Sequence, residues 1–193
     1  DGLDGTRTVT GLAALHPELS AAEVTATLEQ LGELGLVEDA AADSVWLSAG
    51  DQARYDRQLE YFGELAAPGE PRAACQARLR DARVVVIGLG GLGAWTLWSL
   101  AAAGVGRLVG VDGDVVELSN LNRQVLYREE DLGRAKAAAC ERTIAAFNSA
   151  VSFEAIDRRL EDVEAVAAVV READFVIEAA DWPPYLMSRW VNS

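Results

Sequence analysis

A glycine loop between two apolar segments constrains the fold of this chain more than any other feature. The continuous apolar run 84–87 predicts a buried strand, the loop Gly88–Gly93 follows it directly, and the mostly apolar run 92–103 predicts a helix. Dinucleotide-binding turns have this order, because glycines let backbone N–H groups approach phosphates at a helix N-terminus. We therefore expect a nucleotide site at this turn.

The pattern after the loop predicts an α/β fold. Further strands are expected at 108–111, 151–156 and 175–178, with helices at 135–148 and 160–171. Buried strands that alternate with helices form parallel sheets whose faces are covered by those helices. We predict a Rossmann-like, doubly wound, mainly parallel sheet over residues 83–193, with more of this domain following Ser193.

The first 50 residues predict a small separate module. A short amphipathic helix is expected at Thr8–Leu15, and Ser20 and Glu23 form a capping box that begins a second helix. Two short strands, 36–38 and 45–47, are expected after it, joined by a polar turn. Two helices and a β-hairpin indicate a winged-helix-like α+β module.

A connector is expected between this module and the sheet, over residues 51–82. Its first part, Arg54–Phe62, mixes aromatic and apolar side chains with charges. The segment Pro68–Pro71 breaks the chain, and Ala73–Leu79 predicts a helix.

The composition excludes several classes of partner and site. The chain of 193 residues has a net charge of −14, which repels nucleic-acid backbones. No apolar run reaches the roughly 20 residues that span a bilayer. Two separated cysteines and one histidine favour neither a disulfide framework nor a zinc site. We expect a soluble, cytoplasmic protein without nucleic-acid or membrane partners.

An acid follows the second expected strand of the sheet. Asp112 lies roughly 20 residues after the glycine loop, where a carboxylate can accept hydrogen bonds from ribose hydroxyls. Up to this residue, the pattern fits an NAD-dependent oxidoreductase equally well.

The polar residues that come next favour a nucleotide whose phosphates react. Arginine, lysine and amide donors near a phosphate loop stabilise charge on transferring or leaving phosphates. Lys136 is the only lysine among 17 basic residues, and its compact ammonium suits a phosphate contact. These residues are Asp114, Asn120, Arg123, Gln124 and Lys136.

A second acid is expected at the same edge of the sheet. Asp181 lies just past the strand 175–178, and ligands of open α/β sheets bind at the carboxyl ends of the strands. A carboxylate at this place can hold Mg²⁺ against phosphates.

Residues 54–193 resemble the ThiF/MoeB/HesA family, the ATP-binding domain of ubiquitin-activating-type enzymes. The matching motifs are Arg54–Gln58, the glycine loop, Asp112 with Asp114, Ser119–Gln124, Gly133–Lys136 and Asp181. The resemblance implies that ATP and Mg²⁺ activate a peptide or protein carboxylate as an acyl-adenylate, with release of pyrophosphate.

The resemblance also implies roles for single residues. Arg57, Arg123, Lys136 and Asp181 would be catalytic, Asp181 would bind the metal, and Arg57 would reach the γ-phosphate across a homodimer interface. The nucleotide contacts would be Gly88, Gly90, Gly91, Gly93, Asp112, Asp114, Asn120, Arg123, Gln124 and Lys136. One departure is Trp182, which stands where the family shows asparagine and is consistent with an altered substrate channel or a weakened ATPase.

Residues 1–50 resemble the PqqD-like recognition domain of peptide-modifying enzymes. They hold one basic residue, Arg7, against nine acids, which excludes DNA as their ligand. The resemblance implies that a ribosomally synthesised precursor peptide binds through its leader as an added strand. The main alternative is a non-catalytic, leader-binding partner of a YcaO-type cyclodehydratase, and a lesser alternative is the NAD-dependent oxidoreductase.

Overall fold

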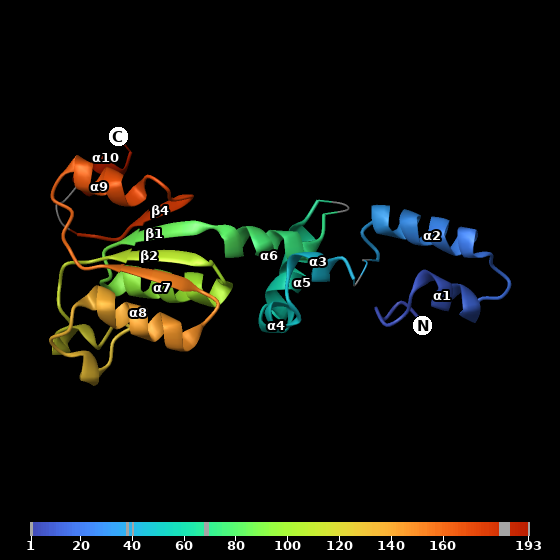
Figure 1. The fold of residues 1–193 in the computed structure, drawn as a ribbon, viewed down its shortest axis with the longest axis horizontal. Helices are drawn as coiled ribbons and strands as arrows, with labels where there is room; N and C mark the ends of the chain where they lie inside the picture. The colour runs from blue at the N-terminus through green and yellow to red at the C-terminus, as the bar shows by residue number, and fades with distance from the viewer. Residues whose placement is uncertain (1, 38, 40, 68–69, 182–185, 193) are drawn as a thin grey trace. The chain divides into compact units, whose positions relative to one another are not determined.

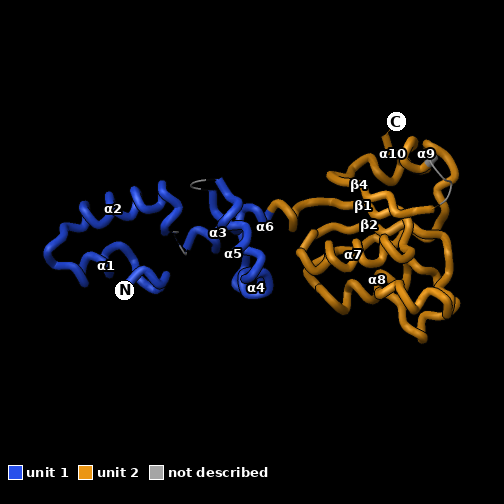
Figure 2. Tube along the Cα trace, turned by 180° about the vertical axis from the view of Figure 1, so that it is seen from behind, with its two compact units in different colours: residues 1–77 blue, residues 78–193 orange. Residues whose placement is uncertain are grey.

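The structure is a computed structural model that describes residues 2–37, 39, 41–67, 70–181 and 186–192 (Figure 1). The chain forms two compact units, residues 1–77 and residues 78–193 (Figure 2). Three sequence expectations fall at least partly outside the described residues: the end of the strand at 36–38, the break at Pro68–Pro71 and the environment of Trp182.

The second unit contains a four-stranded sheet in which every pairing is parallel. The strands are β1 (Arg83–Ile87), β2 (Arg107–Val111), β3 (Ser152–Ile156) and β4 (Phe175–Glu178), in the order β3-β2-β1-β4. In register, Ile87 lies beside both Val111 and Glu178, and Val111 lies beside Ile156. The loops that follow all four strands therefore begin at one edge of the sheet.

Helices cover both faces of this sheet, as expected for a doubly wound fold. Figure 1 shows α7 (Gly91–Ala103) and α8 (Lys136–Phe147) on one face, and α9 (Val163–Val170) and α10 (Leu186–Val191) on the other. Alternate residues of β1 enter two separate cores. Val86 packs in the core under α7 and α8, and Val85 packs in the core under α9 and α10. The prediction of a Rossmann-like, doubly wound parallel sheet is confirmed.

The first unit consists of helices in its described part. They are α1 (Val9–Leu15), α2 (Ala21–Glu33), α3 (Asp43–Trp46), α4 (Ala49–Arg54), α5 (Asp56–Leu65) and most of α6 (Arg72–Asp81). The predicted capping box at the start of α2 is present, with Ser20 and Glu23 each accepting a hydrogen bond from the other's backbone N–H. None of the helices in the described ranges is long and apolar enough to cross a membrane.

The predicted β-hairpin of the winged-helix-like module is wrong. Val45 and Trp46 lie in α3, and residues 36 and 37 are not in a strand. The physical reason is a long-range contact of Asp43, which is buried, lies 2.9 Å from Arg72 and accepts a hydrogen bond from the backbone of Ala73. This contact holds the start of α3 against α6, and the extended conformation that a hairpin needs is lost.

Candidate functional site

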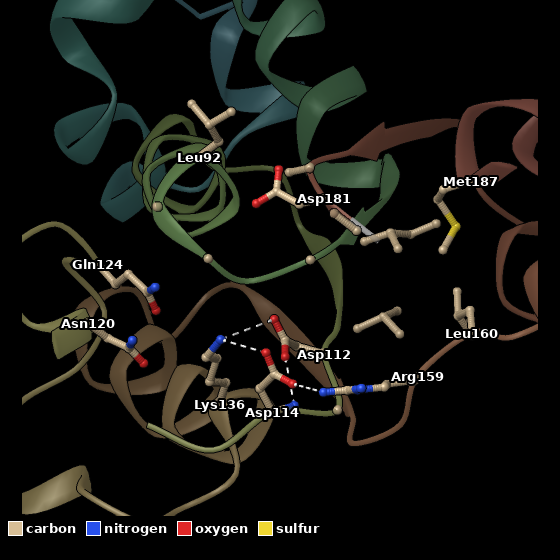
Figure 3. Close-up of a pocket in the computed structure, with 18 of the residues that line it drawn as sticks. Leu92, Asp112, Asp114, Asn120, Gln124, Lys136, Arg159, Leu160, Asp181 and Met187 are labelled. Carbon is tan, nitrogen blue, oxygen red and sulfur yellow. Dashed lines mark hydrogen bonds and ion pairs between the residues drawn. The ribbon is translucent and has the colours of Figure 1, made fainter. Parts of the chain in front are cut away.

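A pocket of about 1450 Å³ lies at the carboxyl edge of the sheet, within the second unit (Figure 3). Its walls come from the loops that follow all four strands and from the first turns of α7 and α8. Ten of the twelve residues predicted as site residues line it. They are Gly88, Gly90, Gly91, Asp112, Asp114, Asn120, Arg123, Gln124, Lys136 and Asp181.

The glycines of the loop have two different structural tasks. Gly88 has φ +89°, and a Cβ there would lie 2.7 Å from the Ala179 carbonyl oxygen. A Cβ on Gly93 would lie 1.8 Å from the carbonyl oxygen of Gly88, so this glycine packs α7 against the loop and does not line the pocket. A Cβ on Gly90 would meet nothing within 4 Å. Side chains are thus excluded at the back of the loop, while the backbone at Gly90 is open to the pocket.

Asp112 ties the second strand to the glycine loop. One carboxylate oxygen accepts a hydrogen bond from the backbone N–H of Leu89 at 2.7 Å, and the other accepts one from Asp114 at 2.8 Å. The side chain is 10% exposed, so this carboxylate keeps only a small open face toward the pocket.

Lys136 lies between two carboxylates at the start of α8. Its Nζ is 3.2 Å from Asp114 Oδ2 and 3.9 Å from Asp112 Oδ2, and its side chain is 8% exposed. An ammonium has three donors, so Nζ keeps donor capacity beyond its hydrogen bond to Asp114, and the residue lines the pocket. Figure 3 shows Nζ beside both acids, with a dashed line to each.

Arg159 completes this charged cluster and was not predicted from the sequence. Its guanidinium donates to Asp114 Oδ1 at 2.7 Å, and a Cβ on Gly113 would lie 2.7 Å from the backbone nitrogen of Arg159. The hydrogen bond from Arg159, followed by the one from Lys136, lowers the pKa of Asp114. The signal that could have found Arg159 is its position directly after the strand 151–156, at the edge where Asp112 and Asp114 lie.

Replacing Arg159 with glutamine is expected to raise the pKa of Asp114 toward its ordinary value of 3.8. A carboxyl with a lowered pKa stabilises the fold above its unfolded pKa, and this contribution is lost as the pH falls through the folded pKa. Wild type should thus exceed Arg159→Gln in unfolding free energy at about pH 6, but only slightly, because Arg159 is exposed and solvent screens the pair. The difference should shrink below about pH 3.8. Carboxyl ¹³C titration and urea unfolding test this, and equal Asp114 pKa values would contradict it.

The segment 118–124 contributes amide and guanidinium groups. Asn120, at the end of the short 3₁₀ helix Leu118–Asn120, is buried and accepts a hydrogen bond from the backbone of Glu117 at 3.0 Å. Arg123 donates to the Ser119 carbonyl at 3.0 Å, and its stem passes 3.7 Å from the Cβ position of Gly91. These contacts hold Arg123 against the glycine loop.

Gln124 has an unused acceptor inside the pocket wall. The residue is 3% exposed, and its Oε1 has no hydrogen-bond partner in the described part of the chain. Figure 3 shows the side chain beside Asn120, facing the pocket. A buried polar atom without a partner costs about 1–3 kcal/mol, so a polar ligand at this place would be favoured.

Asp181 and Arg57 differ in their surroundings. Asp181 is exposed in the pocket wall and makes no hydrogen bond or ion pair with another residue of the described ranges. Arg57 lies on α5 in the first unit, is 85% exposed, and pairs with Glu60 at 2.9 Å. Arg57 is not among the residues that line the pocket. No group of three or more His, Cys, Asp or Glu side chains that could hold a metal occurs in the described residues.

Comparison with known sequences gives a consistent family. The family model described as "ThiF family" matches residues 55–193. The SAMP-activating enzyme E1 of Haloferax volcanii is 47% identical over 135 residues, which cover 70% of this chain and 47% of that protein. The Sulfur carrier protein ThiS adenylyltransferase of Escherichia coli is 39% identical over 131 residues, which cover 68% of this chain and 49% of that protein. The chain thus spans about half the length of these curated relatives.

Solved structures give the same result. PaaA is similar with a TM-score of 0.78 and 32% identity, over 92% of this chain and 54% of that chain. MccB of E. coli with ATP is similar with a TM-score of 0.69 and 27% identity, over 96% of this chain and 52% of that chain. With the glycine loop, the two spaced aspartates and the lysine gathered in one pocket, these matches show that the chain belongs to the ThiF family.

Proposed function

We propose that this protein uses ATP to adenylate the carboxylate of a peptide or small protein. One observation carries this proposal: a single pocket brings together an open glycine loop, the chain's one lysine, Arg123 and the exposed carboxylate of Asp181. Cations beside an open phosphate loop suit a reaction in which phosphates leave. Several relatives are named adenylyltransferases, which supports the same chemistry.

The pocket offers suitable surroundings for each part of ATP. Leu160 and Met187, which are buried members of the core on the α9 and α10 face, offer an apolar wall for the base. Figure 3 shows them on the opposite side of the pocket from Gln124 and Asn120. Asp112 would hold the ribose with the acceptor capacity that its two backbone hydrogen bonds leave free.

The phosphates would lie on the open backbone of Gly90 and Gly91, at the N-terminus of α7. Arg123 and Lys136 would neutralise their charge from the sides, and Gln124 would supply a polar contact. Asp181 fits Mg²⁺, because Mg²⁺ is commonly held by one or two carboxylates together with substrate phosphates and waters. The ion would screen the charge that develops on the phosphates.

The reaction needs little acid–base chemistry. A carboxylate oxygen attacks the α-phosphorus, the bond from that phosphorus to the bridging oxygen breaks, and pyrophosphate leaves with the electron pair. The nucleophile is already ionised, so catalysis rests on positioning and on charge neutralisation. We further propose a homodimer in which Arg57 of one chain serves the site of the other, consistent with its exposure in this structure.

A peptide is the substrate class that we propose. The match to MccB with the peptide MccA covers 96% of this chain, so it includes most of the first unit. We propose that residues 1–50 recognise a precursor peptide, although without the hairpin edge that the sequence suggested. The alternative is a leader-binding protein that presents its peptide to a separate cyclodehydratase and does no ATP chemistry.

ATP–pyrophosphate exchange in the intact protein tests the proposal. We expect exchange that depends on Mg²⁺ and on a peptide with a free carboxylate, and no exchange with the same peptide when its carboxylates are amidated. A sulfur-carrier protein tested in parallel distinguishes the two substrate classes that the relatives represent. Tight peptide binding without ATP binding or exchange would overturn the proposal and favour the binding-only alternative.

A further inference from the structure

We propose that Tyr127 is a positioning residue that fixes the glycine loop for phosphate binding. Its hydroxyl donates a hydrogen bond of 2.8 Å to the backbone carbonyl of Leu89, in the middle of the loop. Tyr127 is 6% exposed and Leu89 is fully buried. Tyr127 does not line the pocket, so it acts on a ligand only through the loop. That the ligand is a phosphate rests on the proposed function, whereas the contact by which Tyr127 holds the loop does not.

The peptide groups of Leu89 are held from two directions. Its N–H donates to Asp112 at 2.7 Å, and its carbonyl accepts from Tyr127. Gly90 and Gly91 follow immediately and carry no side chain that could fix their orientation. The Leu89 carbonyl and the Gly90 N–H belong to one planar peptide group, so the bond from Tyr127 also fixes the direction of the Gly90 N–H. This reduces the ordering that a phosphate would otherwise have to impose on the loop.

The Tyr127 hydroxyl is itself oriented by α8. Cys140 donates to it at 3.5 Å, and burial raises the pKa of this thiol to about 12, so the donor keeps its proton at neutral pH. Burial also raises the pKa of Tyr127, which therefore remains a donor. Cys140 thus donates to Tyr127, which donates to the Leu89 carbonyl. These two hydrogen bonds link the loop to α8, the helix that begins with Lys136. One helix thus positions both the ammonium and the glycine loop.

The substitution Tyr127→Phe tests this inference, because it removes only the hydroxyl. Thr143→Val is a matched control: the Thr143 hydroxyl also donates a buried 2.8 Å hydrogen bond to a backbone carbonyl, that of Leu126, outside the glycine loop. Both variants should lower the unfolding temperature to a similar degree. In the intact protein, we expect Tyr127→Phe to raise the Kd for ATP about tenfold, while the Kd for adenosine changes less than about twofold. Thr143→Val should change neither Kd.

Hydrogen exchange of the amides of residues 88–91 gives a readout that needs no ligand. It should accelerate in Tyr127→Phe and remain at the wild-type rate in Thr143→Val. Unchanged loop exchange in Tyr127→Phe, an equal loss of ATP and adenosine affinity, or the same effects in Thr143→Val would each overturn the inference. If the wild-type protein binds no ATP, the proposed function fails, whereas accelerated loop exchange in Tyr127→Phe alone would still support the hold of Tyr127 on the loop.

Discussion

Replacing Lys136 with alanine is expected to lower ATP–pyrophosphate exchange by about 100- to 1,000-fold and also to weaken the fold. The ammonium pairs with both Asp112 and Asp114, and Lys136 lines the pocket. Its removal takes a cation from the proposed phosphate site and leaves two acids near each other, of which Asp114 still pairs with Arg159. We expect a loss of about 2 kcal/mol in unfolding free energy from the acids that lose their partner.

The substitution Lys136→Arg separates the two effects. A guanidinium keeps the positive charge near the two acids, so the loss of unfolding free energy should be smaller than in Lys136→Ala. The guanidinium is larger, planar and delocalised, so it does not place its charge where the compact ammonium lies. The Lys136 side chain is only 8% exposed, which leaves little room for a different placement. Exchange should therefore remain at least about tenfold below wild type. Near-normal exchange in Lys136→Ala, measured on protein shown to be folded by circular dichroism, would remove Lys136 from the proposed chemistry.

Most of the sheet could be predicted because its strands carry their signal locally. The run Val84–Ile87 is continuous and apolar, as buried parallel strands require. In the turn that follows, glycines stand at the two positions, 88 and 93, where a Cβ would clash with backbone atoms. Since parallel strands end at one edge, the positions of Asp112 and Asp181 in the sequence were enough to place both at the pocket.

Contacts between distant segments could not be predicted in the same way. Arg159 is one of several charged residues in its loop. It reaches Asp114, 45 positions away in the sequence, only because β3 pairs beside β2. Tyr127 has no local pattern that reveals its hydrogen bond to Leu89, 38 positions away. The failed hairpin has the same cause: Val45 and Trp46 favour a strand locally, but the pairing of Asp43 with Arg72 decides the conformation.

Replacing Asp181 with asparagine is expected to lower exchange by about 100-fold or more without lowering the unfolding free energy. This side chain is exposed and has no partner in the described part of the chain, so the fold loses no interaction with its charge. An amide keeps the shape of the carboxylate but has no negative charge to offer a divalent cation. The Mg²⁺ concentration for half-maximal exchange should rise, whereas ATP binding measured without Mg²⁺ should remain unchanged or become slightly tighter, because a charge that repels phosphates is gone.

The control for this prediction is Glu172→Gln, which removes one exposed negative charge before β4, at the opposite end of the strand that Asp181 follows. Because the two substitutions change the net charge equally, a difference between them reflects position and not overall charge. Glu172→Gln should keep wild-type exchange and the wild-type requirement for Mg²⁺. If Asp181→Asn behaved as Glu172→Gln does, Asp181 would have no part in binding the ion. Mg²⁺ would then have to be held by the phosphates and the cluster around Asp112 and Asp114, where Lys136 and Arg159 already compete for the same oxygens.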